Sequence, residues 1–116
     1  MLEITMPRGD LRPVRFTVTE AEGTLCEAEF TEIYVTVKKS MRHAEYLFQK
    51  RLSDGTVARL GPGEYQFTIQ PEDTDGLAVT AYDFDIELIC GRQLKQTFVG
   101  RLTLTGEVTY AENEGA

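Results

Sequence analysis

The chain has 116 residues, of which 41% are hydrophobic, so one domain of common size can bury a core without metal ions or disulfides. Its net charge of -7 opposes nucleic-acid binding, which needs cations that neutralise phosphates. The N-terminal sequence MLEITMPRGD lacks the pattern of a secretory signal peptide, and no stretch is long and apolar enough to span a bilayer. We therefore expect cytoplasmic synthesis and no binding to nucleic acid or membrane.

The first half of the chain predicts short strands separated by turns. Apolar and polar residues alternate in the first three of these segments, a period of two that places one face in a core and the other in water, whereas the inward face of residues 45–52 cannot be assigned. The expected strands are residues 2–6, 14–18, 33–37, 45–52 and 57–60. Pro13 indicates that the second strand begins at a sheet edge or at its own first residue. Ser53-Asp54-Gly55 favours a hairpin, in which residues 57–60 form the returning strand.

The second half continues this pattern with one interruption. After a turn at Gly61-Pro62-Gly63, residues 64–69 alternate again, and residues 71–77 suit one short helical turn that starts at Pro or Asp and ends at Gly76. The longest alternating run is 79–90. Its apolar row is predicted to face the core and consists of Tyr82, Phe84, Ile86, Leu88 and Cys90.

The last strand shares this even-numbered apolar parity, which restricts how it can pair with the run before it. Its apolar residues are Leu94, Phe98, Leu102, Leu104 and Val108. Residues opposite each other in an antiparallel pair lie on the same face of the sheet. Because the apolar residues of both strands have even numbers, the two residue numbers of each pair must sum to an even value. A plain two-residue turn at Gly91-Arg92 would give odd sums. We therefore predict a three- or five-residue loop, or a bulge near Gly100. A three-residue loop pairs Ile86 with Phe98, Phe84 with Gly100, and Asp83 with Arg101.

Seven or eight short strands without crossover helices predict an all-β fold, an antiparallel β-sandwich, with a small barrel as the alternative. We expect a single domain over residues 1–110 and a frayed tail over residues 111–116. Cys26 and Cys90 could form a bridge, but the absent signal peptide favours Cys90 as a small buried hydrophobic residue.

Candidate catalytic and metal-binding residues are few. His43 has no ligand set or catalytic partner among its sequence neighbours, so we interpret it as a solvated turn residue. Four aspartates could in principle gather around calcium, namely Asp73, Asp75, Asp83 and Asp85. A calcium loop needs more acids at fixed spacing, so we interpret the first two as part of a capped turn and the last two as a solvated strand face. We expect no metal and no cofactor.

Two further patterns bear on function. Arg8-Gly9-Asp10 is the tripeptide that adhesion receptors recognise, but a Gly-containing turn between the first two strands explains it as well. The sequence has no Gly-rich phosphate loop, nucleophile elbow or Cys-x-x-Cys pair. Since no nucleophile, base and orienting group occur together, we predict that the protein is not an enzyme.

The order of several segments resembles a known family. They are the strand around Ile4 leading into Arg8-Gly9-Asp10, residues 14–18, the turn with Asp73, Thr74 and Leu77, the Tyr82-x-Phe84-Asp85-Ile86 strand, and Gly100-Arg101-Leu102-Thr103-Leu104 with Val108-Thr109. Over residues 2–110 the chain resembles the immunoglobulin-like domain of tail and baseplate proteins of phages and prophages of Gram-positive bacteria, as in the N-terminal domain of baseplate upper proteins. We expect this chain, unlike those proteins, to be a stand-alone domain without a following coiled coil or receptor-binding module.

The resemblance implies a structural module of a virion, assembled after cytoplasmic synthesis in the bacterial host. Its partners would be other virion or tail proteins, and a homo-oligomer fits the same role. Sheet edges at residues 2–6 or 57–60 are natural docking surfaces. The alternative is a small binding module for a cell-surface glycan or protein, whose aromatic platform for a glycan would be drawn from Tyr34, Tyr46, Tyr65 or Tyr110.

Overall fold

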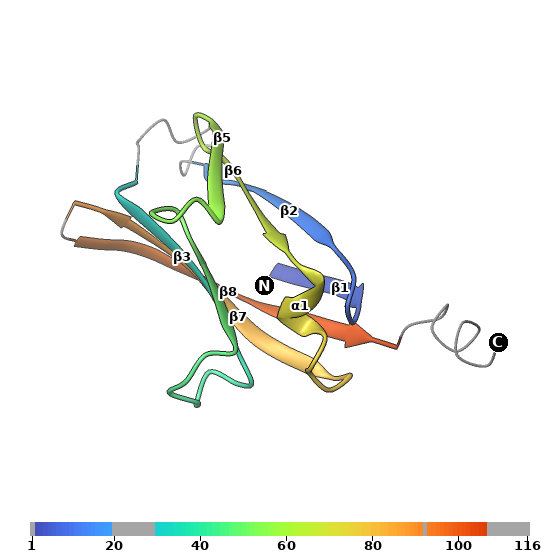
Figure 1. Ribbon diagram of the computed structural model, residues 1–116. Coiled ribbons are helices and arrows are strands. Elements are labelled where there is room, and N and C mark those ends of the chain that lie inside the picture. The colour runs from blue at the N-terminus through green and yellow to red at the C-terminus, as the bar shows by residue number, and fades with distance from the viewer. Residues whose placement is uncertain (1, 20–29, 92, 107–116) are drawn as a thin grey trace.

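Two packed β-sheets form the protein in the computed structural model, which describes residues 2–19, 30–91 and 93–106 (Figure 1). One sheet has the strand order β1-β8-β7-β3-β4 and the other has the order β2-β6-β5. The elements are β1 (Leu2–Pro7), β2 (Arg12–Thr17), β3 (Glu32–Lys38), β4 (Phe48–Arg51), β5 (Val57–Gly61), β6 (Glu64–Ile69), α1 (Pro71–Thr74), β7 (Ala81–Cys90) and β8 (Gln93–Thr105). The predicted two-sheet β architecture is confirmed.

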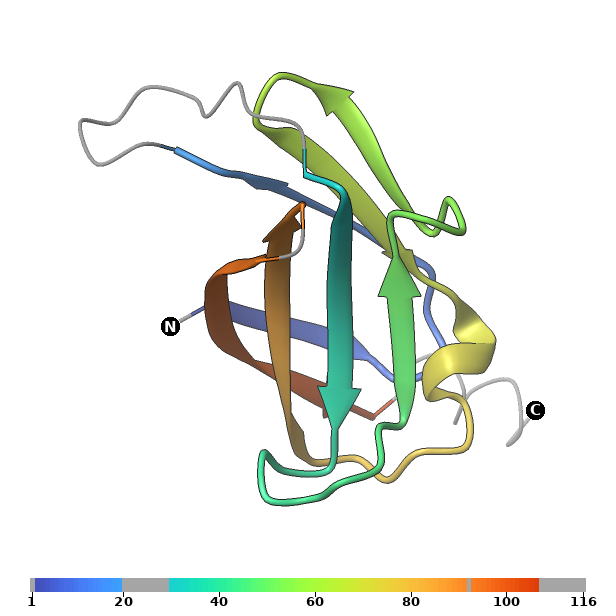
Figure 2. The same ribbon diagram turned by 90° about the vertical axis from the view of Figure 1, so that its left-hand side faces the viewer.

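The buried core is built from residues of both sheets, whose strands Figure 2 shows from a second direction. The predicted inward rows of β3, β6 and β7 are buried, because strand periodicity turns every second side chain toward the opposite sheet. These residues are Ile33, Val35 and Val37, then Tyr65, Phe67 and Ile69, and finally Tyr82, Phe84, Ile86 and Leu88. Cys90, at the end of the last row, is half-buried rather than buried.

The first strand corrects the expectation of a purely antiparallel sandwich. β1 runs parallel to β8, from Leu2 opposite Gly100 to Pro7 opposite Thr105. The turn at Arg8-Gly9-Asp10 carries the chain from the five-stranded sheet to the three-stranded sheet, so β1 and β2 are not hairpin partners. Gly9 permits this crossing with a φ of 85°, a conformation that side chains disfavour.

A second correction concerns the turn at Ser53-Asp54-Gly55. It connects β4 in one sheet to β5 in the other, so it is a crossing between sheets and not a hairpin. Gly55 has a φ of 83°, and the Thr56 N–H donates to Asp54 Oδ1 at 2.9 Å, which is the turn chemistry that the sequence displays. Strand β4 begins only at Phe48, three residues later than predicted, and β5 pairs with β6. Turn chemistry therefore predicted the bend but not the partner.

The pairing of β7 with β8 confirms the parity argument. Ile86 lies opposite Phe98, Phe84 opposite Gly100, and Asp83 opposite Arg101, as predicted. The irregularity that restores even parity is a bulge at the Leu88–Ile89 step, and Cys90 pairs with Gln93 across a two-residue turn. The predicted three- or five-residue loop and the predicted bulge near Gly100 are therefore both wrong.

The inward face of β8 is buried over only part of its length. Leu102 and Leu104 are buried, whereas Phe98 is 41% exposed and corrects the prediction that it belongs to the core. Strand β1 accompanies β8 only from Gly100 onward, so Phe98 lies beyond the cover that β1 provides. The side chain of Leu94 and residue Val108 lie outside what the structure describes.

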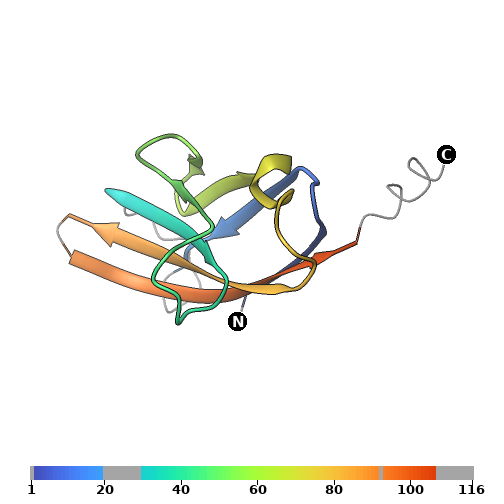
Figure 3. The ribbon, with the colours of Figure 1, turned by 60° about the horizontal axis from the view of Figure 1, so that its bottom comes forward.

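The short helix α1 occupies the connection between β6 and β7, as predicted, and Figure 3 shows it against one end of the sandwich. Pro71 starts it, and Asp73 accepts the Gln70 N–H at 2.7 Å, which caps the first turn. Asp73 also bonds the Lys50 ammonium at 2.6 Å, with both side chains largely buried. This ion pair ties the edge strand β4 to α1.

Candidate functional site

His43 occupies an exposed turn, in agreement with its interpretation from sequence. The ring Nδ1 of His43 lies 2.8 Å from the Ser40 hydroxyl, and the backbone N–H of His43 donates to the Ser40 carbonyl at 3.0 Å. Both interactions are local to the turn.

The four aspartates weighed as calcium ligands are occupied by other roles or lie apart. Asp73 is bonded to Lys50, and Asp83 Oδ2 accepts the Met41 N–H at 3.0 Å. Burial raises the pKa of Asp85, and the nearby Glu87 raises it further. Within the described ranges, no three His, Cys, Asp or Glu side chains are placed to hold a metal ion.

The Arg8-Gly9-Asp10 turn is held against α1 and the residues that follow it. Arg8 Nη1 donates to the Leu77 carbonyl at 3.1 Å, and the Gly9 N–H donates to the buried Thr74 hydroxyl at 2.8 Å. The half-buried Arg8 therefore serves the junction between this turn and α1, which favours the structural interpretation of the tripeptide.

The tyrosines proposed as a glycan platform do not share a surface role. Tyr65 is fully buried and stacks on Phe16 with ring centroids 5.6 Å apart, which corrects its assignment to the platform. Tyr34 is half-buried beneath the Arg51 guanidinium, and Tyr46 is exposed. Tyr110 lies outside the described residues, as does Cys26, the potential partner of Cys90.

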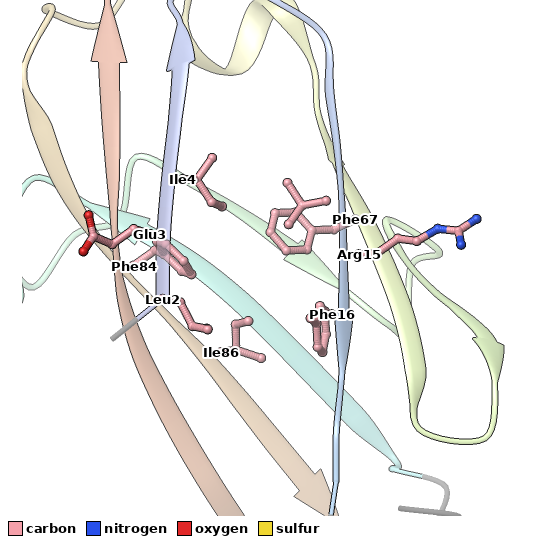
Figure 4. A pocket seen from close by; sticks show the side chains of 9 residues that line it. Leu2, Glu3, Ile4, Arg15, Phe16, Phe67, Phe84 and Ile86 are labelled. Atoms are coloured by element: carbon pink, nitrogen blue, oxygen red, sulfur yellow. The ribbon is translucent and has the colours of Figure 1, made fainter. Parts of the chain in front are cut away.

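A surface hollow lies between the edges of the two sheets (Figure 4). Strands β1 and β2 form its two walls, and β6 and β7 form its floor. Apolar side chains converge in it, while Glu3 and Arg15 point away from it on opposite sides. Its volume is about 150 Å³, and its apolar lining consists of Leu2, Ile4, Val14, Phe16, Phe67, Phe84 and Ile86.

A second hollow of about 140 Å³ adjoins the first, because both are lined by Leu2, Phe16 and Ile86. Its remaining lining includes Leu88 and the exposed Phe98. We call the two hollows together the edge groove. Apolar residues of β2, β7 and β8 line the groove, among them Phe16, Ile86 and Phe98.

Beside the edge groove, β8 has a backbone edge without a paired strand among the described residues. β7 pairs with one side of β8 along its length, whereas β1 pairs with the other side only from Gly100 to Thr105. Residues 96–99, Gln-Thr-Phe-Val, therefore present backbone N–H and C=O groups on the side away from β7. We call this stretch the open edge.

The open edge differs from the four complete edge strands of the two sheets, each of which has a feature that discourages further pairing. Strand β2 contains Pro13 and β1 ends at Pro7, so each lacks a backbone donor there. Strand β4 is four residues long and points Lys50 inward, and β5 carries Arg59 next to a register shift. The open edge, by contrast, is uncharged and contains the β-favouring residues Thr97, Phe98 and Val99.

Sequence reasoning predicted edges at residues 2–6 and 57–60, and both segments do lie at sheet edges. The open edge was not predicted, because the apolar residues of β8 have even numbers like the buried row of β7 and so indicate an interior strand. The position of β8 in the sheet depends on its parallel pairing with β1, which alternation alone cannot reveal.

The longest helix among the described residues is α1, and none of the described helices could cross a membrane. Comparison with protein-family models and with curated proteins finds no match to this chain.

Proposed function

We propose that the domain has an immunoglobulin-like topology. In that fold, strands B, E and D form one sheet and strands C, F and G form the other, with a further strand beside C in variable-type domains. The order β2-β6-β5 matches the first set, and β8-β7-β3 followed by β4 matches the second. The Tyr82 hydroxyl donates to the Ala78 carbonyl at 2.7 Å, at the start of β7, where the immunoglobulin fold has its tyrosine corner.

For function, we propose a non-catalytic assembly module that binds other proteins through the edge groove and the open edge. The observation that carries this proposal is the coincidence of exposed apolar side chains with a strand edge that has no partner strand among the described residues. Unpaired strand edges bind extended segments, and contiguous exposed apolar surface marks interaction sites. The order of segments described above supports the more specific role of a phage or prophage tail or baseplate component, joined to other virion proteins.

This proposal is tested by asking whether the chain is found in virus particles. A tagged chain would be expressed in the bacterium that carries its gene, prophage production induced, and particles separated on a density gradient. The tag should co-sediment with particles and remain with them after a salt wash that removes loosely bound proteins. If the chain stays entirely in the soluble fraction while particles form, the virion role is wrong.

A further inference from the structure

We infer that Asp75-Gly76 is a site of spontaneous backbone isomerisation, in which the aspartate becomes isoaspartate, and that the fold protects the other Asp-Gly step, Asp54-Gly55. These are the two Asp-Gly steps of the chain, and both lie in exposed turns. The modification is independent of the proposed function, because it needs no partner protein and no cofactor.

The reaction uses only the aspartate carboxyl group, the next main-chain nitrogen and water. The Gly76 nitrogen attacks Cγ of Asp75, an N–Cγ bond forms, and the hydroxyl of the protonated carboxyl leaves with the amide proton as water. Water then opens the cyclic imide. Attack at the α-carbonyl breaks the former peptide bond and leaves Gly76 attached through Cγ, which is isoaspartate. Glycine favours this attack because it has no Cβ atom beside the nucleophilic nitrogen.

At Asp54-Gly55 both reacting groups are held. The Asp54 carboxylate accepts the Thr56 N–H at 2.9 Å and also the Thr56 hydroxyl. The Gly55 N–H donates to the Leu52 carbonyl at 3.1 Å. The bond from the Thr56 hydroxyl, followed by that from the Thr56 N–H, lowers the pKa of Asp54, so less of the reactive protonated carboxyl is present. Ring closure at this step must first break these hydrogen bonds.

At Asp75-Gly76 neither reacting group is held. The Asp75 carboxylate has no hydrogen bond or ion pair to the described part of the chain, and the Gly76 N–H has no acceptor there. Asp75 is the C-cap of α1, and its own N–H bonds the Pro71 carbonyl, so the α-helical hydrogen bonds end at this residue. The space is open, because a Cβ atom at Gly76 would meet nothing within 4 Å. The nitrogen and the carboxyl are therefore free to meet.

Isomerisation at Asp75 lengthens the main chain by one carbon atom within a hydrogen-bonded turn. The Leu77 N–H donates to the Thr74 carbonyl at 2.9 Å, so this turn encloses the added atom. The Thr74 hydroxyl also accepts the Gly9 N–H at 2.8 Å, which joins α1 to the turn after β1. The isoaspartyl form should therefore lose protection from hydrogen exchange at the Leu77 and Gly9 amides.

The test follows the complete chain during incubation at neutral pH and body temperature in water enriched in heavy oxygen. Each ring opening adds one heavy oxygen atom, so mass spectrometry of proteolytic fragments measures the reaction at each step. Label should accumulate at Asp75 at least about fivefold faster than at Asp54, because one hydrogen bond of ordinary strength changes an equilibrium by about this factor. Endoproteinase Asp-N, which does not cleave at isoaspartate, should progressively lose its cut before Asp75 in the same samples.

Incubation in urea separates the effect of the fold from that of the local sequence. The hydrogen bonds are absent in the unfolded chain, so the two steps should take up label at similar rates.

Two variants each change one step in the folded chain. Gly76→Ala should suppress labelling at Asp75, because a methyl group then stands beside the attacking nitrogen. Thr56→Val should raise labelling at Asp54, because the carboxylate loses a hydrogen-bond donor. Circular dichroism of both variants checks that they are folded.

Four results would overturn the inference. The first two are equal labelling of Asp75 and Asp54 in the folded chain, and no label at Asp75 after prolonged incubation. The third is a preference for Asp75 that persists undiminished in urea, because the flanking residues and not the fold would then set the difference. The fourth is labelling of Asp54 that Thr56→Val leaves unchanged, because the hydrogen bonds of Thr56 would then give no protection.

Discussion

Replacing Lys50 with methionine should destabilise the fold, although it keeps most of the side chain's volume. Lys50 lies on the inner face of β4, and its ammonium is 2.6 Å from Asp73 Oδ2, with side-chain exposures of 10% and 14%. Loss of the ammonium leaves a largely buried carboxylate without its counter-ion, and such a loss costs about 3–5 kcal/mol. Asp73 keeps the Gln70 N–H at 2.7 Å, so we expect the lower end, about 3 kcal/mol.

The double variant separates the ion pair from simple packing. Asp73→Asn strands the Lys50 ammonium and should also destabilise, while its amide oxygen can still cap α1. Lys50→Met with Asp73→Asn removes both charges, and replacing a whole buried pair is often close to neutral. The two single effects should therefore exceed the double effect by about 2 kcal/mol or more.

Urea unfolding followed by far-ultraviolet circular dichroism measures these differences, since the chain contains no tryptophan. Lys39→Met is the control, because Lys39 is exposed, and its effect should stay within about 0.5 kcal/mol. A Lys50→Met protein as stable as the parent, or single effects that simply add in the double variant, would refute the reasoning.

Two further predictions concern β8 and its neighbour. Gly100→Ala should destabilise the fold by about 1–3 kcal/mol in the same urea assay, because a Cβ atom there would lie 2.5 Å from the Phe84 ring. Gly61→Ala in β5 is the control, because a Cβ atom at Gly61 meets nothing within 4 Å and causes no clash. Asp85→Asn should raise the melting temperature at pH 7, because desolvation and then Glu87 raise the pKa of Asp85 and make its charge unfavourable in the folded state. A group whose folded pKa is raised loses stability as pH rises through its titration, so this gain should shrink to nothing below the ordinary aspartate pKa, and a gain independent of pH would contradict it.

Alternation predicted the parts of the fold that depend on side-chain parity. The apolar rows of β3, β6 and β7 were readable because strand geometry forces a period of two. Parity also predicted the pairs Ile86 with Phe98 and Asp83 with Arg101. Parity did not show where the register shift between β7 and β8 lies. A bulge at Leu88–Ile89 and a longer loop both shift the pairing by one residue, so either satisfies the parity rule.

Side-chain alternation did not predict which strands pair with each other. Ser53-Asp54-Gly55 has the chemistry of a tight turn, but the same chemistry serves a hairpin and a crossing between sheets. The inward Lys50 of β4 breaks the apolar pattern, so periodicity gave that strand no inward face. The candidate site was not readable for the same reason, since Leu2 of β1 reaches the edge groove only through the pairing of β1 with β8.

The pairing of the first strand with the last also sets the order in which the protein can be completed during translation. Leu2 contacts a strand whose Gly100 is synthesised nearly a whole chain later, and at about 5–20 residues per second this interval is on the order of 5–20 s. Throughout it, Ile4 and Met6 have no β8 to cover them, and they are available to chaperones. Closure of the five-stranded sheet therefore waits for β8, and a ribosome that stalls before Gly100 leaves the N-terminal strand without its neighbour.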